Sequence, residues 1–355
     1  MNAHEPARTE VLVVGAGPAG MAAAASLSDQ GVETMVVDKQ AEMMNTSRAA
    51  VVHARTLEVL EEIGVTEELV ARGIRVSKFT VREHDRVLLH IDFDQLPSEV
   101  TALAQDPAGV TVTLATGEQI RAGYVIGADG MHSLVREQAG ITFHGDSYPQ
   151  SFVLADVVLT GDVTDAEVRL YFAPEGVTVL APLPGGRHRI VATVDDAPPH
   201  PDRSQVQALL DTRGPRTGSI DVTDLGWSSR FRVHHRLADR YRAGRVFLAG
   251  DAAHVHSPAG GQGMNTGIQD ALDLARRLGA VLRDGAPDST LDGYEAERRP
   301  VAEEIVAFTD KMTRAATLGS PALRAIRNTA MRTLDWLPAV HRKMALTLSE
   351  LKTGH

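Results

Sequence analysis

A glycine-rich turn near the start of the chain constrains the fold more than any other feature. It reads Gly15-Ala16-Gly17-Pro18-Ala19-Gly20, follows an apolar run at residues 10–14 and opens an alanine-rich stretch at residues 18–29. Short apolar runs of this kind are typical of buried parallel strands, and alanine favours a helix. A second apolar run at residues 34–37 completes a strand, turn, helix and strand. The pattern therefore predicts a parallel α/β sheet.

Each glycine of this turn has a separate role in such a unit. Gly15 permits a tight turn, Gly17 lets the backbone approach a pyrophosphate, and Gly20 lets the helix pack closely on the strand. Asp38, followed by Lys39, comes at the end of the second strand, where its carboxylate can bind a ribose hydroxyl. A glycine-rich turn without a ligand is the alternative. The flanking strand, helix and acidic residue favour a dinucleotide site.

A second motif occupies residues 127–136 and again follows an apolar run. Asp129 and Gly130 have the composition of a turn, and Ser133 is a good N-cap for a short helix. Turns of this type are common. This motif alone therefore indicates only a strand, a turn and a helix.

The third motif is the most specific. The apolar run from Val246 to Ala249 predicts a buried strand that ends at Asp251, where a carboxylate can accept a ligand hydroxyl. The glycine-rich loop at residues 260–263 can bring bare backbone against a flat ring. A helix predicted to begin near Met264 directs its positive end at that loop. An ordinary strand-to-helix connection does not need this composition, so a ligand-binding role is favoured.

In this order and spacing, the three motifs resemble the FAD-dependent aromatic-ring monooxygenases, the family of p-hydroxybenzoate hydroxylase and the polyketide hydroxylases. Residues 47–49 and 53–60 are also similar to this family, and the resemblance extends over residues 9–320. It implies an α/β fold with a Rossmann-like FAD-binding domain of the glutathione-reductase type and a second, mainly antiparallel-sheet substrate domain. It also implies a reaction in which NADPH or NADH supplies electrons to non-covalent FAD, and one oxygen atom of O2 reaches a small aromatic substrate.

The resemblance further implies cofactor contacts at particular positions. The glycine-rich turn would hold the FAD pyrophosphate, Asp38 the adenosine ribose, and Arg48 would lie near the phosphates. Asp251 would bind the ribityl side of FAD, and the run from Gly261 to Asn265 would contact the pyrimidine edge of the flavin. The predicted cofactor-binding residues are Gly15, Ala16, Gly17, Pro18, Ala19, Gly20, Asp38, Lys39, Arg48, Asp129, Gly130, Asp251, Pro258, Gly261, Gly263, Met264 and Asn265. No catalytic side chain is identified, because the cofactor carries the chemistry.

A length of 355 residues favours two domains. Alternating polar and apolar residues in the middle of the chain predict antiparallel strands, and the chain from about residue 294 is predicted to be helical, with Pro300 and Pro321 as boundaries. The expected FAD-binding domain comprises residues 1–73, 97–150 and 236–315. The expected substrate domain comprises residues 74–96 and 151–235, and residues 316–355 form a C-terminal helical segment.

One segment departs from the family pattern. Family members have a helix and a strand before the counterpart of Glu99, whereas here Ser98 runs directly into Glu99. A parallel crossover needs about 10–12 residues or more, so we expect this element to be deleted. We expect a weaker FAD site as a result. The alternative is that residues 99–105 take over the vacant strand position.

The remaining features mainly exclude functions. The net charge of −10 is spread along the chain without a basic stripe, which argues against nucleic-acid binding. Cysteine is absent, so disulfides and thiolate chemistry are excluded. We expect no targeting segment, no membrane span and no metal site, with His254 and His256 as ordinary loop residues. A cytoplasmic location is expected, and a homodimer is compatible with the resemblance.

Two other functions stay open. One is a related flavin dehydrogenase or epoxidase on the same fold. The other is a flavin- or ligand-binding protein that has lost turnover through the deletion.

Overall fold

The computed structural model describes residues 6–39, 78–83, 86–92, 99–163, 167–183, 185–215, 219–257, 262–316, 318 and 320–334. Its first elements are strand β1 (Ala7–Val14), helix α1 (Pro18–Asp29) and strand β2 (Thr34–Val37). Pro18 lies in the first turn of α1, where its missing N–H leaves no hydrogen bond unmade. The predicted strand, turn, helix and strand are therefore confirmed.

These strands belong to a seven-stranded sheet whose main path runs β13-β14-β7-β1-β2. A hairpin of β5 and β6 joins the sheet at the first half of β7. The additional strands are β5 (Val100–Asp106), β6 (Gly109–Leu114), β7 (Gln119–Gly127), β13 (Arg242–Ala243) and β14 (Val246–Leu248). The pairs β1–β2, β1–β7 and β7–β14 are all parallel, as a Rossmann-like unit requires.

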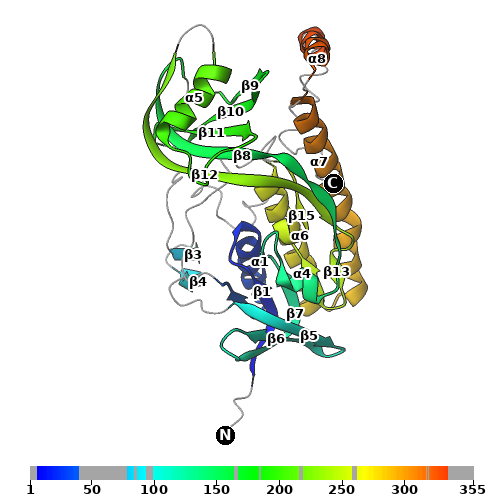
Figure 1. Ribbon diagram of the computed structural model, residues 1–355. Helices are drawn as coiled ribbons and strands as arrows, with labels where there is room; N and C mark the ends of the chain where they lie inside the picture. Colours follow the sequence, from blue (N-terminus) through cyan, green and yellow to red (C-terminus); the bar gives the residue numbers. More distant parts are fainter. Residues whose placement is uncertain are drawn as a thin grey trace.

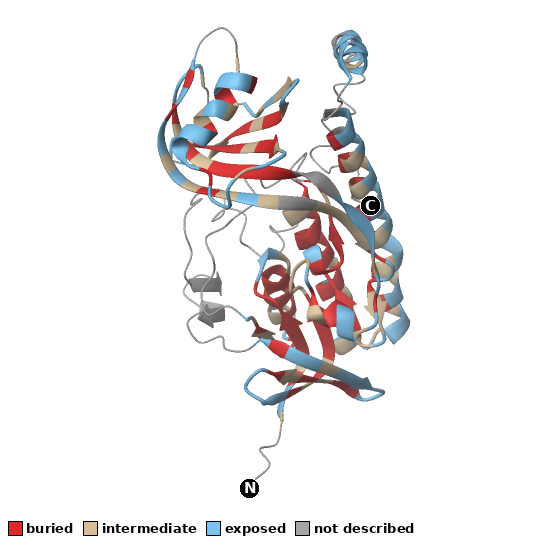
Figure 2. Cartoon of the chain, in the orientation of Figure 1, coloured by how far each residue is buried: buried red, intermediate tan, exposed pale blue. Residues whose placement is uncertain are grey.

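The main hydrophobic core lies between this sheet and two helices. Helix α1 and helix α6 (Gly263–Leu282) lie side by side against the parallel strands (Figure 1). Residues 11–13 of β1 have no exposed surface, which is typical of a strand covered on both faces. Figure 2 shows the same concentration of buried residues in these strands and helices.

A second sheet has the order β15-β12-β8-β11-β10-β9, and all of its pairs are antiparallel. Its strands are β8 (Phe143–Gly161), β9 (Arg169–Ala173), β10 (Gly176–Leu183), β11 (Arg187–Val194), β12 (Ile220–Ala238) and β15 (His254–Val255). Helix α5 (Arg203–Arg213) buries Val206 and Leu210 in a second core against this sheet. The predicted fold class, a parallel α/β unit with a mainly antiparallel second sheet, is confirmed.

Strands β8 and β12 are 19 residues long and pair along most of their length. They run from the second sheet down to the helices of the first unit (Figure 1). The first unit and the second sheet are therefore joined by continuous strands and not by a flexible linker.

The region of the expected deletion contains two hairpins. Among the residues that the structure describes, strands β3 (Lys78–Glu83) and β4 (Arg86–Asp92) pair only with each other. Strand β5 pairs with β6, so the alternative in which residues 99–105 fill the position beside β2 is wrong. Within the described part of the chain, β2 pairs with β1 alone.

The last described elements are helical. Short segments α4 (Leu134–Gln138), η2 (Gly250–Ala252) and η3 (Asp288–Leu291) precede the long helices α7 (Asp292–Ala316) and α8 (Pro321–Leu334). Pro321 begins α8, as predicted. The prediction of a boundary at Pro300 is wrong, because Pro300 lies inside α7. Pro300 and Ala296 are both exposed, so water can satisfy the Ala296 carbonyl that loses its helical partner.

None of the helices in the described residues is long and apolar enough to cross a membrane.

Candidate functional site

Four strands end together at one edge of the seven-stranded sheet. Val14 of β1 is in register with Val37 of β2 on one side and with Gly127 of β7 on the other, and Gly127 is in register with Leu248 of β14. The glycine-rich turn, Asp38, the second motif and the third motif follow these four strands. The three motifs therefore begin side by side although they lie far apart in the sequence. Open α/β sheets bind ligands at this edge, where the strand order reverses.

The glycine-rich turn has no room for side chains where it meets the second motif. Gly15 has a φ of 107°, and a Cβ at this position would overlap the carbonyl oxygen of Ala128. A Cβ at Gly20 would overlap the carbonyl oxygen of Gly15. These two glycines therefore let α1, the turn and the second motif lie in contact.

Gly17 has a different environment. Apart from its own chain neighbours, no atom of the described residues lies within 4 Å of its Cβ position, so its backbone faces open space at the start of α1. No side chain caps this helix end, and its free N–H groups and positive dipole suit a phosphate. The turn, which includes Ala16, Pro18 and Ala19, thus fits a pyrophosphate.

Asp38 is held against the same turn. Its carboxylate accepts a hydrogen bond from the backbone N–H of Ala16 at 2.7 Å. Lys39 follows and is exposed. The acidic residue at the end of β2 thus shapes the turn in addition to bordering the predicted dinucleotide site.

The second motif forms the predicted turn and cap. One Asp129 oxygen accepts hydrogen bonds from the N–H groups of Leu134 and Val135, and Ser133 Oγ accepts one from the N–H of Arg136. Gly130 has a φ of 82°, which glycine adopts without strain. The other Asp129 oxygen is buried and has no hydrogen-bond partner among the described residues. A buried carboxylate oxygen of this kind is placed to accept a hydrogen bond from a bound ligand.

The third motif lies against the first. Strand β14 ends at Leu248, so Asp251 does not end the strand as predicted but lies in the 3₁₀ turn η2, where it is exposed. A Cβ at Gly250 would lie 2.9 Å from the Ala19 side chain, and a Cβ at Gly267 would lie 2.9 Å from the Gly250 backbone. These small residues let α1, η2 and α6 pack without intervening side chains.

The helix predicted near Met264 begins at Gly263. No side chain caps its N-terminus, Asn265 is completely buried, and Met264 packs against the main core. The predicted contacts at Arg48, Pro258 and Gly261 lie outside the described residues.

Arg136 links the second and third motifs, a role that the sequence did not reveal. Its guanidinium is buried and donates to the backbone carbonyls of Met131 and Ala252, each at 3.0 Å. It also lies 4.0 Å from the centre of the Phe143 ring, at the start of β8. Burial lowers the pKa of Arg136, although Asp129 opposes this effect.

The prediction of ordinary loop histidines is wrong for His254. His254 lies in β15, is almost completely buried, and contacts Asp270 of α6 at 2.7 Å. Asp270 also accepts a hydrogen bond from Arg298 of α7 at 2.6 Å. Burial would raise the pKa of Asp270, but Arg298 and His254 outweigh it and hold the pKa below its ordinary value.

His256 stacks on His254 with ring centres 6.3 Å apart. Its Nδ1 lies 2.9 Å from the Ser257 carbonyl, so in the neutral tautomer Nδ1 carries the proton and Nε2 the lone pair. Burial and the neighbouring His254 lower the pKa of His256 to about 4. His256 is therefore neutral at physiological pH.

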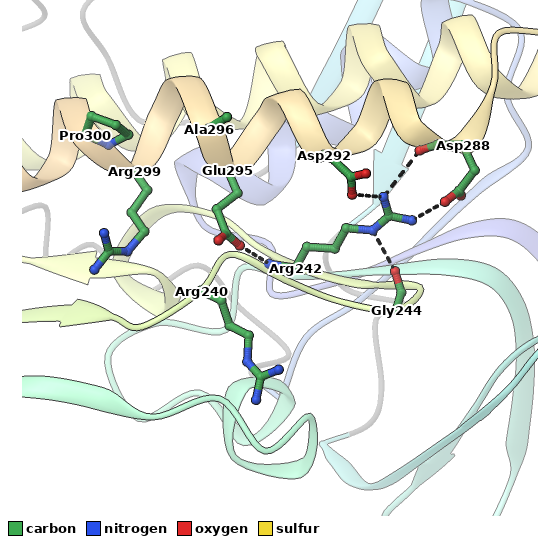
Figure 3. A pocket seen from close by; sticks show the side chains of 9 residues that line it. All are labelled: Arg240, Arg242, Gly244, Asp288, Asp292, Glu295, Ala296, Arg299 and Pro300. Carbon is green, nitrogen blue, oxygen red and sulfur yellow. Dashed lines mark hydrogen bonds and ion pairs between the residues drawn. The ribbon is translucent and has the colours of Figure 1, made fainter.

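A cavity of about 640 Å³ lies elsewhere, along the outer side of α7. Figure 3 shows its charged lining, in which Arg242 contacts Asp288 and Asp292 and the carboxylate of Glu295 lies beside the β13 backbone. None of the predicted cofactor residues lines it. The cavity is therefore separate from the edge where the motifs meet.

The turn, the uncapped helix ends and the clustered motifs define the class of proteins that bind a dinucleotide at the carboxyl edge of a parallel sheet. Comparison with known families narrows this class, because the model of the FAD binding domain family matches residues 8–105 and 85–309. The chain belongs to this FAD-binding family.

Relatives and solved structures agree. The chain is 37% identical to a 6-methylpretetramide 4-monooxygenase of Streptomyces rimosus, over 90% of this chain and 63% of the relative. It is 36% identical to a rifampicin monooxygenase of Streptomyces venezuelae, over 84% of this chain and 70% of the relative. The solved structure of an anhydrotetracycline hydroxylase of Streptomyces rimosus superposes with a TM-score of 0.74 and 32% identity, over 97% of this chain and 76% of that one.

The lengths differ in an informative way. The chain spans about two thirds of the length of these curated relatives. The alignment with the pretetramide enzyme spans 361 residues but uses only 90% of this chain's 355, about 320. About 40 aligned positions of the relative thus have no counterpart in this chain.

Proposed function

We propose that the protein is an FAD-dependent monooxygenase that hydroxylates an aromatic substrate, with NADPH or NADH as electron donor and O2 as oxidant. The observation that carries the proposal is the register of Val37, Val14, Gly127 and Leu248, which brings all three motifs to one edge. Membership of the FAD-binding family and the names of its relatives support the same activity.

The motifs divide the cofactor between them. The turn from Gly15 to Gly20 would hold the pyrophosphate, supported by the open space at Gly17. Asp38 and Lys39 would hold the adenosine ribose and Arg48 the phosphates. Asp251, exposed in η2, would bind the ribityl chain. The flavin would lie against Pro258, Gly261, Gly263, Met264 and Asn265.

Asp129 and Gly130 would border both FAD and the nicotinamide donor. The unpartnered Asp129 oxygen supports this position, because a ligand donor would satisfy it. Arg136 would keep the second and third motifs at a fixed separation through its bond to the Ala252 carbonyl.

FAD supplies the redox chemistry that moves one oxygen atom from O2 to an electron-rich ring. The protein would bind the cofactor and orient the substrate. Helix α6 is 20 residues long and points its N-terminus at the predicted flavin position, so its dipole would stabilise negative charge there. The antiparallel second sheet would orient the substrate and help to keep water out. No side chain is assigned a catalytic role.

The proposal includes non-covalent FAD, a cytoplasmic location, a homodimer and the division of domains expected from the sequence. The chain has no cysteine, and His254 and His256 already contact Asp270 and Ser257. Acid precipitation should therefore release the yellow flavin into the supernatant. Colour that stays in the pellet would show a covalent bond.

The activity is tested by the flavin spectrum of the purified protein, followed by NADPH oxidation with O2 and candidate phenols. Hydroxylated product in proportion to NADPH consumed supports the monooxygenase. Substrate oxidation without incorporation of ¹⁸O from ¹⁸O2 indicates a dehydrogenase, and an epoxide product indicates an epoxidase. Bound FAD without turnover on any substrate indicates an impaired flavin-binding protein.

A further inference from the structure

The segment from Gly250 to Ser257 joins the predicted ribityl site to the predicted flavin loop. Asp251 lies near its start, and only the two residues of β15 pair with β12. The Ala253 carbonyl accepts a hydrogen bond from the N–H of Ala238, and Ser257 Oγ accepts one from Thr313 Oγ1 at 2.7 Å. The first part of the segment is also held by Arg136, which donates to the Ala252 carbonyl, and by the Gly250–Ala253 turn, so the question is what fixes the part that follows, at β15.

The strongest contact of the segment is a buried polar chain. His254 Nε2 lies 2.7 Å from one oxygen of Asp270, and Arg298 Nε lies 2.6 Å from the other. His254 is 1% exposed, Asp270 0% and Arg298 8%. This network of three side chains therefore connects β15, α6 and α7 in the interior, where water does not compete for the hydrogen bonds.

The charges in this hydrogen-bonded network determine whether His254 donates or accepts. An ionised carboxylate can only accept hydrogen bonds, so His254 Nε2 donates to one oxygen of Asp270 and Arg298 donates to the other. A buried ion pair is weak evidence for stability, since apolar residues of similar volume often replace it at no loss. What such a pair does provide here is one fixed direction for the imidazole.

Aromatic contacts hold the same ring. Tyr241 stacks on His254 at 6.3 Å between ring centres, and its backbone N–H donates to the carboxylate of Glu295. Figure 3 shows Glu295 reaching from α7 toward this backbone. His256 also stacks on His254. Its Nε2 is the atom that would lie nearest to a Cβ at Gly263, where α6 begins, at a distance of 3.6 Å.

We propose that His254 is a positioning residue for FAD. By donating to Asp270 it fixes the segment from Gly250 to Ser257, and thereby the relative placement of Asp251 and the start of α6, which would hold opposite ends of the flavin and ribityl group. The inference rests on the proposed function, because it concerns the cofactor of that site.

The test compares two substitutions at one position. His254→Phe keeps the ring and removes the donor, whereas His254→Gln keeps an N–H donor and removes the ring. Asp273→Asn is the matched control, because it breaks an ion pair with Arg277 on the same helix, away from the segment. For each protein, the dissociation constant of FAD is measured below the melting temperature, together with the melting temperature and the amide hydrogen exchange of residues 250–257 without flavin.

We expect His254→Phe to weaken FAD binding by about tenfold or more, and His254→Gln to restore it to within about threefold of the parent. Exchange of residues 250–257 should rise in His254→Phe alone. FAD binding by His254→Phe equal to the parent overturns the proposal, as does a loss of affinity that simply follows melting temperature in all three variants. A parent chain that binds no FAD overturns the proposed function, while the exchange data still decide whether His254 fixes the segment.

Discussion

The described sheet extends further on one side of strand β1 than on the other. Toward β7 and β14, the sheet continues in parallel register, and the motifs contact one another through Gly15 and Ala128, Arg136 and Ala252, and Ala19 and Gly250. Toward β2, the described sheet ends after one strand, which is joined to the turn by two hydrogen bonds, from the Gly15 N–H to the Val37 carbonyl and from the Ala16 N–H to the Asp38 carboxylate. The described contacts between the three motifs are thus concentrated on the side of β7 and β14.

We propose that this difference would let the chain keep a cofactor site even if the crossover is deleted. The element that we expect to be deleted would lie on the β2 side of β1, away from the second and third motifs. About 40 aligned positions of a relative without counterpart support such a deletion. Substitutions on the complete side should therefore have larger effects than changes near β2.

The largest effect is expected from Gly15→Ala. A Cβ at a φ of 107° is strained and would overlap the Ala128 carbonyl, so we expect a loss of about 3 kcal/mol or more in unfolding free energy. Urea denaturation measures it. Gly17→Ala is the control, because open space surrounds that position. It should keep the parent stability but weaken FAD binding, and equal stability of both variants would contradict the described turn.

Asp251→Ala should come next. Loss of a charge-assisted hydrogen bond to the ribityl chain costs about 1.5–3 kcal/mol, or roughly tenfold to a hundredfold in FAD affinity. The ratio of flavin to protein absorbance after gel filtration measures retention. Asp211→Ala, in exposed helix α5, should retain flavin like the parent. Equal occupancy in Asp251→Ala and the parent would argue against the ribityl assignment.

The sequence predicted the elements around each motif because local patterns determine them. The strand, turn and helix at Gly15, the Ser133 cap and the start of α6 follow from composition and short spacing. The contacts of Arg136 with Ala252 and of Asp270 with His254 and Arg298 could not be predicted from the residues. Each joins residues far apart in the chain, and several charged residues were equally suitable partners until the fold placed them.

Pro300 is a position where a local sequence signal gave the wrong prediction. A proline normally ends a helix, but α7 continues through it because the carbonyl that loses its partner is on the exposed side. Solvent exposure of that face depends on the tertiary packing of α7, which the local sequence does not contain.

A smaller effect should appear in the pH dependence of stability. The pKa of His256 is about 4 in the folded chain, below the ordinary value of 6.5. Between these two pH values the unfolded chain therefore binds a proton that the folded chain does not. The contribution of His256 to the unfolding free energy should thus be constant above pH 6.5. It should fall as the pH is lowered toward 4, by on the order of 1 kcal/mol per pH unit. Urea denaturation between pH 7 and 5 measures the slope.

His256→Phe should flatten that slope, whereas the same substitution at the exposed His144 should leave it unchanged. A parent slope that persists in His256→Phe would mean that another group is responsible.

The smallest effect is expected on the incomplete side. Insertion of the helix and strand of a relative between Ser98 and Glu99 should satisfy backbone groups at the edge of β2. We expect FAD to bind about fivefold tighter, equivalent to about 1 kcal/mol. Isothermal titration of parent and chimaera measures the change. An insertion of equal length made of glycine and serine is the control, and if both insertions act alike, the missing strand is not the cause.

Titration of the flavin-free chain with FAD decides whether the three-motif edge is an FAD site. We expect saturable binding of one FAD per chain, which restores the flavin spectrum of a bound cofactor, with a dissociation constant above about 1 µM because of the expected deletion. Absence of saturable binding would contradict the assignment of the three-motif edge as an FAD site. A submicromolar constant would confirm the site but contradict the effect assigned to the incomplete side of the sheet.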